Sequence, residues 1–232
     1  MIVRRAAQHR GQFDHGWLQS AHSFSFADYY DPEHMGFHSL RVINEDHIAP
    51  GKGFATHPHR DMEILTWVLA GQIAHKDSMG HSAISGPGEI QAMSAGSGIA
   101  HSEFNASTSQ PLHLLQIWIL PREAGLPPRY QQRRCDEARL HNRLFLLAAP
   151  PEQESLVDIH QDARVWVGRL DHGQQLAHRL EPDRGAWIQV AKGAITLNQT
   201  RLDSGDGAAA SGEEQLQLTA LAQSEVLLFD LL

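Results

Sequence analysis

The chain is divided into many short apolar stretches, and this pattern most constrains the fold that it can adopt. Each stretch is rich in Val, Ile, Leu or Trp and is bounded by turn-forming residues such as Gly and Pro. The clearest stretches are residues 64–69, 112–120, 187–190 and 225–231. Many short strands separated by turns are typical of an antiparallel sandwich or barrel. The sequence therefore predicts an all-β protein with only short helical connections.

Two parts of the sequence resemble each other at a nearly constant offset. Residues 67–73 match residues 189–195 at an offset of 122, and the Pro-Gly-Glu turn at 87–89 matches the Ser-Gly-Asp turn at 204–206 at an offset of 117. Two landmarks in the same order indicate a duplicated unit. We therefore expect two related antiparallel barrels. The expected domains are residues 1–135 and residues 136–232.

Two pairs of potential metal ligands lie in the N-terminal half. His57 and His59 are two residues apart, as are His101 and Glu103. Residues i and i+2 of a strand point to the same face, so each pair can direct two ligands at one point. Three imidazoles and a carboxylate suit a divalent transition metal and leave room for water, substrate or dioxygen. The pattern therefore indicates a catalytic metal site rather than a structural one.

A second carboxylate, Glu63, is an alternative ligand. It has the same strand parity as His57 and His59, but it lies about 13 Å beyond His59 at ~3.3 Å per residue of extended chain. Glu103 is adjacent to His101 on the same face of a strand, so geometry favours Glu103. Glu63 is then expected beside the site, where it would orient a ligand imidazole.

The C-terminal half does not repeat these ligands. At the offset of 122, His57 corresponds to Arg179, and the position that corresponds to His101 has no histidine near it. We therefore predict a single metal centre, in the first barrel. The histidines without ligand spacing, among them His22 and His75, are expected to be ordinary surface or hydrogen-bonding residues.

Composition and charge exclude several classes of function. The formal net charge of −8 opposes non-specific binding to nucleic acid or anionic membranes. No apolar run approaches the roughly 18 residues needed to span a bilayer. The N-terminus lacks the apolar core of a secretory signal, and the single Cys135 excludes an intramolecular disulfide. These features favour the cytoplasm.

The spacing of glycines and ligands resembles the two motifs of the cupin superfamily. The first motif is Gly51-x5-His57-x-His59-x3-Glu63-x7-Gly71, and a looser second motif is Ser94-x-Gly96-x4-His101-x3-Asn105. More narrowly, the chain resembles the pirin family, and in length it is similar to the bacterial pirin-like quercetin 2,3-dioxygenases. The segments that carry this resemblance are FSFADYYDP at 24–32, MGF at 35–37, LRVIN at 40–44, HPHRDME at 57–63 and MSAGSGIAHSE at 93–103.

The resemblance implies a bicupin, in which two antiparallel β-barrels of the jelly-roll type face each other and only the N-terminal barrel binds metal. The implied ligands are His57, His59, His101 and Glu103. One divalent transition metal is expected, with iron as the first choice and nickel, copper, manganese, cobalt or zinc as alternatives. Since one chain supplies both barrels, we expect a monomer.

The activity implied by the resemblance is cleavage of a flavonol ring with dioxygen and release of carbon monoxide. The substrate would be a small planar aromatic or enolic compound, and Glu103 would act as both ligand and general base. A non-enzymatic alternative is a metal- or redox-responsive regulator that acts through a protein partner. Another cupin activity, such as a different dioxygenase or an isomerase, is a third hypothesis. Candidates for the wall of the substrate pocket are Phe26, Phe37, Met93, Phe104 and His113.

Overall fold

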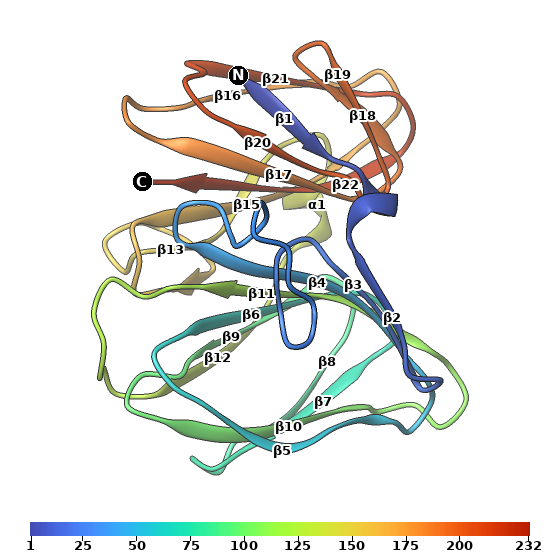
Figure 1. The fold of residues 1–232 in the computed structure, drawn as a ribbon, viewed down its shortest axis with the longest axis vertical. Helices are drawn as coiled ribbons and strands as arrows, with labels where there is room; N and C mark the ends of the chain where they lie inside the picture. The colour runs from blue at the N-terminus through green and yellow to red at the C-terminus, as the bar shows by residue number, and fades with distance from the viewer.

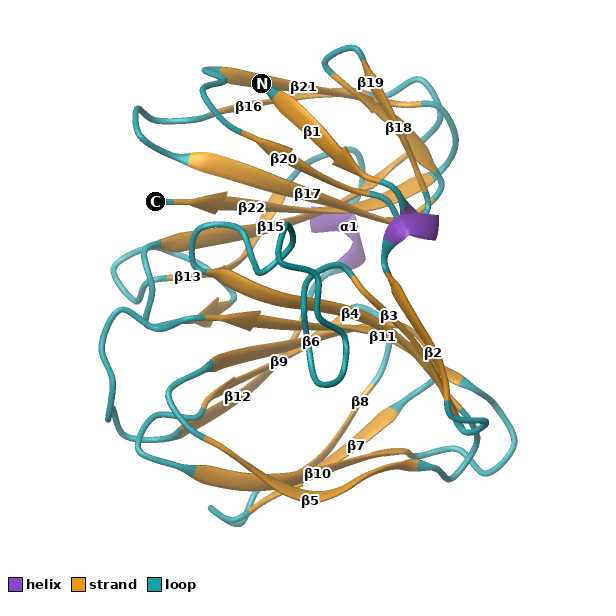
Figure 2. Ribbon diagram, in the orientation of Figure 1, coloured by secondary structure: helices purple, strands orange, loops and turns teal.

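The computed structural model describes residues 1–232 as two stacked barrels of β-strands (Figure 1). Each barrel consists of one seven-stranded and one four-stranded sheet, and every pairing between named strands is antiparallel except the short pair β13–β14. Helices are confined to two single turns, η1 (Ala7–His9) and α1 (Glu137–Leu140) (Figure 2). Neither has the length or apolar character required to cross a membrane. The expected all-β class with two antiparallel barrels is confirmed.

The N-terminal barrel occupies the lower half of Figure 1. Its seven-stranded sheet has the order β12-β9-β6-β11-β4-β3-β2, and its four-stranded sheet has the order β5-β10-β7-β8. The strands are β2 (Gly11–Asp14), β3 (Leu18–His22), β4 (Leu40–Ile48), β5 (Gly53–His59), β6 (Glu63–Ala70), β7 (Ile73–Asp77), β8 (Ser82–Ser85), β9 (Glu89–Ser94), β10 (Ile99–Asn105), β11 (Leu112–Ile119) and β12 (Arg129–Arg134).

The C-terminal barrel occupies the upper half. Its larger sheet has the order β1-β20-β17-β22-β15-β13-β14, and its smaller sheet has the order β16-β21-β18-β19. The strands are β1 (Ile2–Arg5), β13 (Phe145–Ala149), β14 (Val157–Asp158), β15 (Ala163–Leu170), β16 (Gln175–Arg179), β17 (Gly185–Lys192), β18 (Ala194–Leu197), β19 (Thr200–Asp203), β20 (Gly207–Ala210), β21 (Gln215–Ala220) and β22 (Ser224–Leu231).

The two seven-stranded sheets pack face to face across the middle of the molecule (Figure 1). A cluster of 25 buried residues fills the space between them, with Trp67 and Leu115 from the N-terminal sheet and Trp187 and Phe229 from the C-terminal sheet. In β6 and β17, which are covered on both faces, every residue except the last is buried. Burial on both faces explains why these strands have nearly unbroken apolar sequences.

The interiors of the two barrels are filled differently. A cluster of 15 buried residues, all aliphatic, fills the C-terminal barrel. The N-terminal barrel contains only two small apolar clusters, one of six residues that includes Val68 and one of four that includes Met93. Buried polar side chains, including Asp46, His101 and Glu103, occupy other parts of its interior. The N-terminal barrel is therefore the one that can hold a polar site.

The internal repeat of the sequence is visible in the strand order. The central strands β9-β6-β11-β4 of one large sheet correspond to β20-β17-β22-β15 of the other, and the small sheets correspond strand for strand. β6 begins at Glu63 and β17 begins at Gly185, which is the expected offset of 122. The two barrels are therefore two copies of one topology.

One outermost strand of the large sheets crosses between the halves of the sequence, whereas another, β12, stays within its own half. β1 begins the chain, yet it pairs with β20 of the C-terminal barrel, with Ile2 opposite Ala210. β12 completes the other edge by pairing with β9 of the N-terminal barrel. The domain boundary expected between residues 135 and 136 falls between β12 and α1 and stays a prediction. β1 lies on the N-terminal side of that boundary in the sequence and in the C-terminal sheet in space.

Candidate metal centre

Strands β5 and β10 bring three imidazoles to one point inside the N-terminal barrel. The two strands are antiparallel neighbours, and His101 lies directly opposite His57 in their register. The Nε2 atom of His101 is 3.0 Å from Nε2 of His59 and 3.1 Å from Nε2 of His57. The structure thus brings together the three histidines that strand parity singles out.

Hydrogen bonds at the far side of two rings fix where the protons lie. The Nδ1 atom of His57 is 2.8 Å from the carbonyl oxygen of Ala55, so it must donate its proton there. His75 bonds Asp77 through Nε2 at 3.3 Å, which leaves its Nδ1 to accept from Nδ1 of His101 at 3.4 Å. Both His57 and His101 therefore present an Nε2 lone pair to the centre of the cluster.

Two of the three imidazoles, those of His59 and His101, have a lowered pKa and resist protonation. Burial lowers the pKa of His59 to about 4, with a further contribution from His57. Burial and the neighbouring imidazoles lower the pKa of His101 to about 3. Neutral rings whose lone pairs face one another about 3 Å apart repel unless a cation lies between them. The donor set therefore fits a divalent transition metal.

Glu103 lies two residues beyond His101 on β10 and is 2% exposed. Its Oε2 atom accepts a hydrogen bond of 2.9 Å from Nε2 of Gln116 on β11. Burial raises the pKa of Glu103 to about 7, and the nearby charge of Asp46 adds to the shift. Glu103 forms a compact group of potential ligands with His75 and His101, separate from the group of His57, His59 and His101. Its assignment as the fourth ligand stays a prediction.

Glu63 lies on the other side of the sheet. Leu65 and Trp67, which share its parity on β6, belong to the core between the barrels, whereas Ile64 faces the interior of the N-terminal barrel. Glu63 accepts a hydrogen bond of 2.7 Å from Ser94 Oγ rather than contacting an imidazole of the cluster. The expectation that it orients a ligand is corrected, because a turn between β5 and β6 resets the strand parity.

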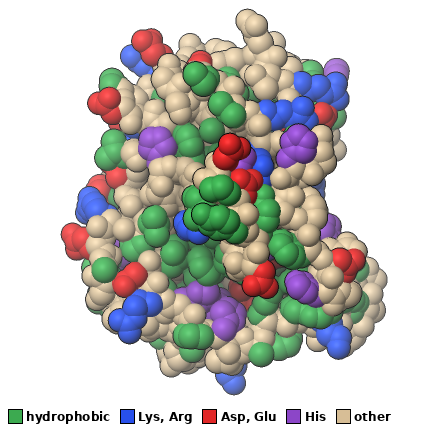
Figure 3. Space-filling view, viewed as in Figure 1, with side chains coloured by type: hydrophobic (Ala, Val, Ile, Leu, Met, Phe, Trp, Pro, Cys, Tyr) green, Lys and Arg blue, Asp and Glu red, His purple; other side chains and the backbone are tan.

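A cavity of about 450 Å³ opens beside the imidazole cluster. Figure 3 shows histidine side chains exposed over the N-terminal barrel, in the lower half of this face. The wall has an aromatic part, in which the rings of Phe26 and Trp118 lie edge to face at 5.2 Å and Trp118 also meets the ring of His59 at 5.0 Å. The residues that line the cavity are His15, Leu18, Ser20, His22, Phe26, Ala27, Asn44, Asp46, Phe54, His57, Pro58, His59, Glu103, Gln116 and Trp118.

Of the five residues predicted for this wall, the structure places Phe26 in it. Phe37 instead lies 6.2 Å from the ring of Trp187 and packs against the core between the barrels. Met93 is buried in the small apolar cluster with Ile64. For these two side chains, the expected position in the pocket is corrected.

Strand direction explains the other two differences. Phe104 follows Glu103 on β10, so its side chain points out of the barrel, where it is 39% exposed. His113 points away from the cavity on β11 and bonds Glu45 through Nε2 at 2.9 Å. Phe104 and His113 therefore do not line the cavity.

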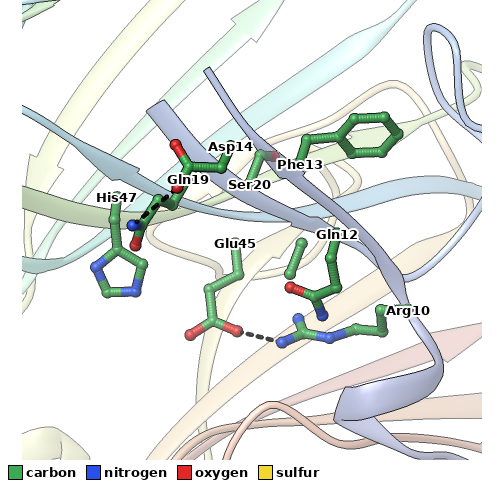
Figure 4. Close-up of a pocket in the computed structure, with 9 residues that line it drawn as sticks. Arg10, Gln12, Phe13, Asp14, Gln19, Ser20, Glu45 and His47 are labelled. Atoms are coloured by element: carbon green, nitrogen blue, oxygen red, sulfur yellow. Dashed lines mark hydrogen bonds and ion pairs between the residues drawn. The ribbon is translucent and has the colours of Figure 1, made fainter. Parts of the chain in front are cut away.

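His113 lies near a second cavity, of about 400 Å³, on the outer face of the same sheet. Figure 4 shows Glu45 among the residues that line this cavity, with its carboxylate directed toward Arg10, to which it is bonded at 2.8 Å. Although burial opposes ionisation, the hydrogen bond from His113 and the charge of Arg10 lower the pKa of Glu45 to about 2. The ring of His47 stacks on that of His113 at 3.9 Å. Since Arg10 and His113 already bond the two carboxylate oxygens of Glu45, we read this group as a hydrogen-bonded ion-pair cluster.

The sequence did not single out one functional side chain, His75, and it left undecided whether two others, Gln116 and Trp118, face the cavity. His75 bonds Nδ1 of His101, on the side of the ring away from the cluster. Gln116 and Trp118 form part of the cavity wall. The alternation His75-Lys76-Asp77 is the one signal that could have identified His75, since it repeats the spacing seen at His57. β11 is apolar on both faces because it separates two cores, so parity alone could not show that Gln116 and Trp118 face the cavity.

The C-terminal barrel has leucines where the N-terminal barrel has polar ligands. Register through β18 and β21 aligns Leu216 with His101 and Leu218 with Glu103. His178 lies opposite Leu216, as His57 lies opposite His101, so His178 rather than Arg179 corresponds to His57. The difference of one residue matches an irregularity of register in the β5–β10 pair.

The fold and the imidazole cluster define a two-domain cupin with one candidate metal centre. A family model described as pirin matches residues 3–119, and a model described as the quercetinase C-terminal cupin domain matches residues 146–231. The chain belongs to the pirin family.

Similar proteins cover the chain from end to end. A quercetin 2,3-dioxygenase of Escherichia coli strain K12 is 48% identical over 231 residues, which cover 100% of this chain and 99% of that protein. A pirin-like protein of Caulobacter vibrioides is 38% identical over 231 residues and covers 99% of both chains. Among solved structures, the bacterial pirin YhhW from Escherichia coli in complex with nickel(II) matches with a TM-score of 0.95 at 48% identity, covering 100% of this chain and 99% of that chain.

Proposed function

We propose that this protein is a metal-dependent dioxygenase that cleaves the ring of a flavonol with O2 and releases carbon monoxide. The observation that carries the proposal is the convergence of the Nε2 atoms of His57, His59 and His101 beside a cavity of about 450 Å³. A cavity of this volume lies in the usual range for sites that bind small organic molecules. Relatives named quercetin 2,3-dioxygenase support the substrate class.

His57, His59 and His101 would hold one divalent metal ion, with Glu103 as the fourth ligand. Iron is our first choice, and the nickel complex of the YhhW structure makes nickel the first alternative to test. When bound, the ion supplies Lewis acidity that lowers the pKa of a coordinated hydroxyl group. His75 holds His101 in the orientation that presents Nε2 to the ion.

Glu103 is the residue that would accept the proton of the flavonol 3-hydroxyl. Its pKa, raised to about 7, makes it a suitable general base near neutral pH. Gln116 donates to Oε2 of Glu103 and holds the carboxylate toward the cavity. Phe26 and Trp118 provide aromatic surface for a planar ring and limit the access of water. The overall reaction consumes one O2 and releases one CO for each flavonol, so no external electrons are required.

Aerobic turnover of quercetin by protein of known metal content tests the proposal. We expect flavonol absorbance to fall in step with release of carbon monoxide, and we expect His57→Ala to abolish both. Arg179→Ala, at an exposed site in the C-terminal barrel, is the matched control and should retain full turnover. Metal-loaded protein that consumes no flavonol would contradict the proposal and favour a regulator or another enolic substrate.

Glu103→Gln tests the role of the general base. Removing such a group lowers turnover by about 100-fold or more. Metal content should fall much less, because the three imidazoles remain. A variant that turns over flavonol at the normal rate would remove Glu103 from the mechanism.

A further inference from the structure

Four polar side chains form a compact patch on the cavity wall that faces the imidazole cluster. They come from β3 and β4, in which Ser20 pairs with Asp46 and His22 pairs with Asn44. All four line the cavity, and none is more than 6% exposed. β3 and β4 belong to the seven-stranded sheet, whereas His57, His59 and His101 belong to the four-stranded sheet across the barrel (Figure 1). The patch is therefore separate from the three imidazoles, although Asp46 lies near enough to Glu103 to raise its pKa.

Hydrogen bonds within the patch determine the tautomer of His22. Ser20 Oγ donates to Oδ1 of Asp46 at 2.5 Å. A hydroxyl has a single proton, so the contact of 2.8 Å between Ser20 Oγ and His22 Nε2 requires Nε2 to be the donor. Burial and the charge of Arg10 lower the pKa of His22 to about 4, which keeps the ring neutral. His22 Nδ1 is therefore a hydrogen-bond acceptor.

Two acceptors in this patch have no partner. Neither Nδ1 of His22 nor Oδ1 of Asn44 makes a hydrogen bond, although both atoms are buried. Buried polar groups are nearly always paired, because leaving one unpaired costs its full desolvation. The His22 ring is also fixed, with the ring of Phe13 stacked at 4.9 Å and that of Phe26 edge-on at 5.2 Å. Two unpaired acceptors on residues that line the cavity, one of them on a fixed ring, indicate a ligand that donates hydrogen bonds.

We propose that His22 and Asn44 form a subsite for the ring hydroxyl groups of the substrate, opposite the candidate metal centre. The proposal rests on the proposed function, because it takes the substrate to be a flavonol. It adds that the distal ring must be hydroxylated for tight binding. Ser20 and Asp46 act as positioning residues, because they hold the proton of His22 on Nε2.

Binding to nickel-loaded protein under argon tests the subsite without turnover. The probes are two flavonols, one with an unsubstituted phenyl ring and one with two adjacent hydroxyls on that ring, and quenching of protein fluorescence reports their affinity. Each hydrogen bond gained should tighten binding by about threefold to tenfold. We therefore expect the dihydroxylated flavonol to bind at least about fivefold more tightly to the wild-type protein.

Variants then show which residues cause the preference for the dihydroxylated flavonol. Asn44→Leu and His22→Phe remove one acceptor each and should bring the two affinities within about twofold of each other, with nickel content unchanged. Asn44→Asp retains an acceptor and should keep the preference. Gln19→Ala, on the opposite face of β3, is the matched control and should behave as the wild type.

The outcomes separate this proposal from the one on which it rests. Equal affinity of the wild-type protein for both flavonols would overturn the subsite and leave the dioxygenase intact. A preference that persists in both Asn44→Leu and His22→Phe would also overturn it. Failure to bind either flavonol would overturn the proposed function together with the subsite. If a variant does not fold, the comparison in the wild-type protein still decides.

Discussion

The two barrels share one topology, but the interior of the N-terminal barrel contains polar side chains that can bind a ligand, whereas that of the C-terminal barrel contains a closely packed aliphatic core. His101 and Glu103 of the N-terminal barrel correspond to Leu216 and Leu218 of the C-terminal barrel. The same holds on the large sheets, where Gln116 corresponds to Leu228. A polar residue at the centre of a barrel requires partners or a ligand, whereas a leucine requires only close packing.

The comparison teaches how a duplicated fold can keep a costly site. The interior of the N-terminal barrel contains a cavity and therefore buries fewer apolar side chains. The 15-residue core of the C-terminal barrel and the 25-residue core between the sheets supply most of the apolar burial. Trp67 of the N-terminal sheet donates to Glu225 of the C-terminal sheet at 2.7 Å, which ties the two barrels together. The stable half thus supports the half that carries the site.

We expect the largest effect from removing a histidine of the imidazole cluster, which should release the metal, whereas removing the corresponding histidine of the C-terminal barrel should not. His101→Ala removes the imidazole that contacts both other rings, so we expect nickel affinity to fall by more than about 100-fold. His178→Ala, its control in the second barrel, should leave the stoichiometry unchanged at one ion per chain. Elemental analysis after nickel loading measures both. Loss of the ion in His178→Ala would break the comparison.

The free energy of unfolding should depend more on the interior of the C-terminal barrel than on that of the N-terminal barrel. Leu228 is fully buried among aliphatic side chains, so Leu228→Ala should destabilise the metal-free protein by about 2–5 kcal/mol. Gln116→Ala, at the corresponding position beside the cavity, should cost about 1–2 kcal/mol through its hydrogen bond to Glu103. Urea unfolding at pH 7 measures the two values. Equal losses would show that the N-terminal interior is as tightly packed as the C-terminal one.

Acid should weaken the N-terminal barrel first. Burial lowers the pKa of His22 and His59 from 6.5 to about 4 and that of His101 to about 3, so the unfolded chain binds protons at these rings that the folded chain does not. Protonation of Glu103, whose pKa is raised to about 7 by burial, offsets part of this effect. The stability of the metal-free protein should be fully present above pH 6.5 and decline as the pH falls toward 4.

Amide hydrogen exchange at pH 7 and pH 5 measures this effect for each barrel. Protection of β3 and β5 should fall more than protection of β17 and β22. His22→Phe should reduce the decline, because it removes one of the three rings. Equal loss of protection in both barrels would contradict the assignment.

The smallest effect is expected at Glu63, which strand parity assigned to the site. Since Glu63 faces the core between the barrels and bonds Ser94, Glu63→Gln should leave nickel affinity within about twofold and change stability by no more than about 1 kcal/mol. Ser94→Ala provides a second test of the same contact. A large loss of nickel in Glu63→Gln would return Glu63 to the metal centre.

Local patterns predicted the fold class and the imidazole cluster. The alternation of side chains along one strand is a local property, so His57 and His59 could be placed on one face without knowing the rest of the chain. The match between residues 67–73 and 189–195 likewise revealed the duplication, because equivalent strands retain equivalent turns.

The remaining features depend on contacts that are distant in the sequence. A turn in which Asp61 adopts a positive φ of 49° separates Glu63 from the parity of His59. β11 is apolar on both faces, so its sequence does not reveal whether the face of His113 or the face of Gln116 borders the cavity. The orphaned acceptors of His22 and Asn44 become visible only when β3 and β4 are paired.

The placement of β1 sets an order in which the molecule can be completed. This strand ends at Arg5, whereas its partner β20 begins at residue 207 and is synthesised roughly 200 residues later. At about 5–20 residues per second, roughly 10–40 s separate the synthesis of the two strands. β1 therefore stays unpaired until β20 has been synthesised, and its pairing completes the edge of the C-terminal sheet. A chain that lacks residues 1–10 would expose the unpaired edge of β20, and such edges are prone to aggregation.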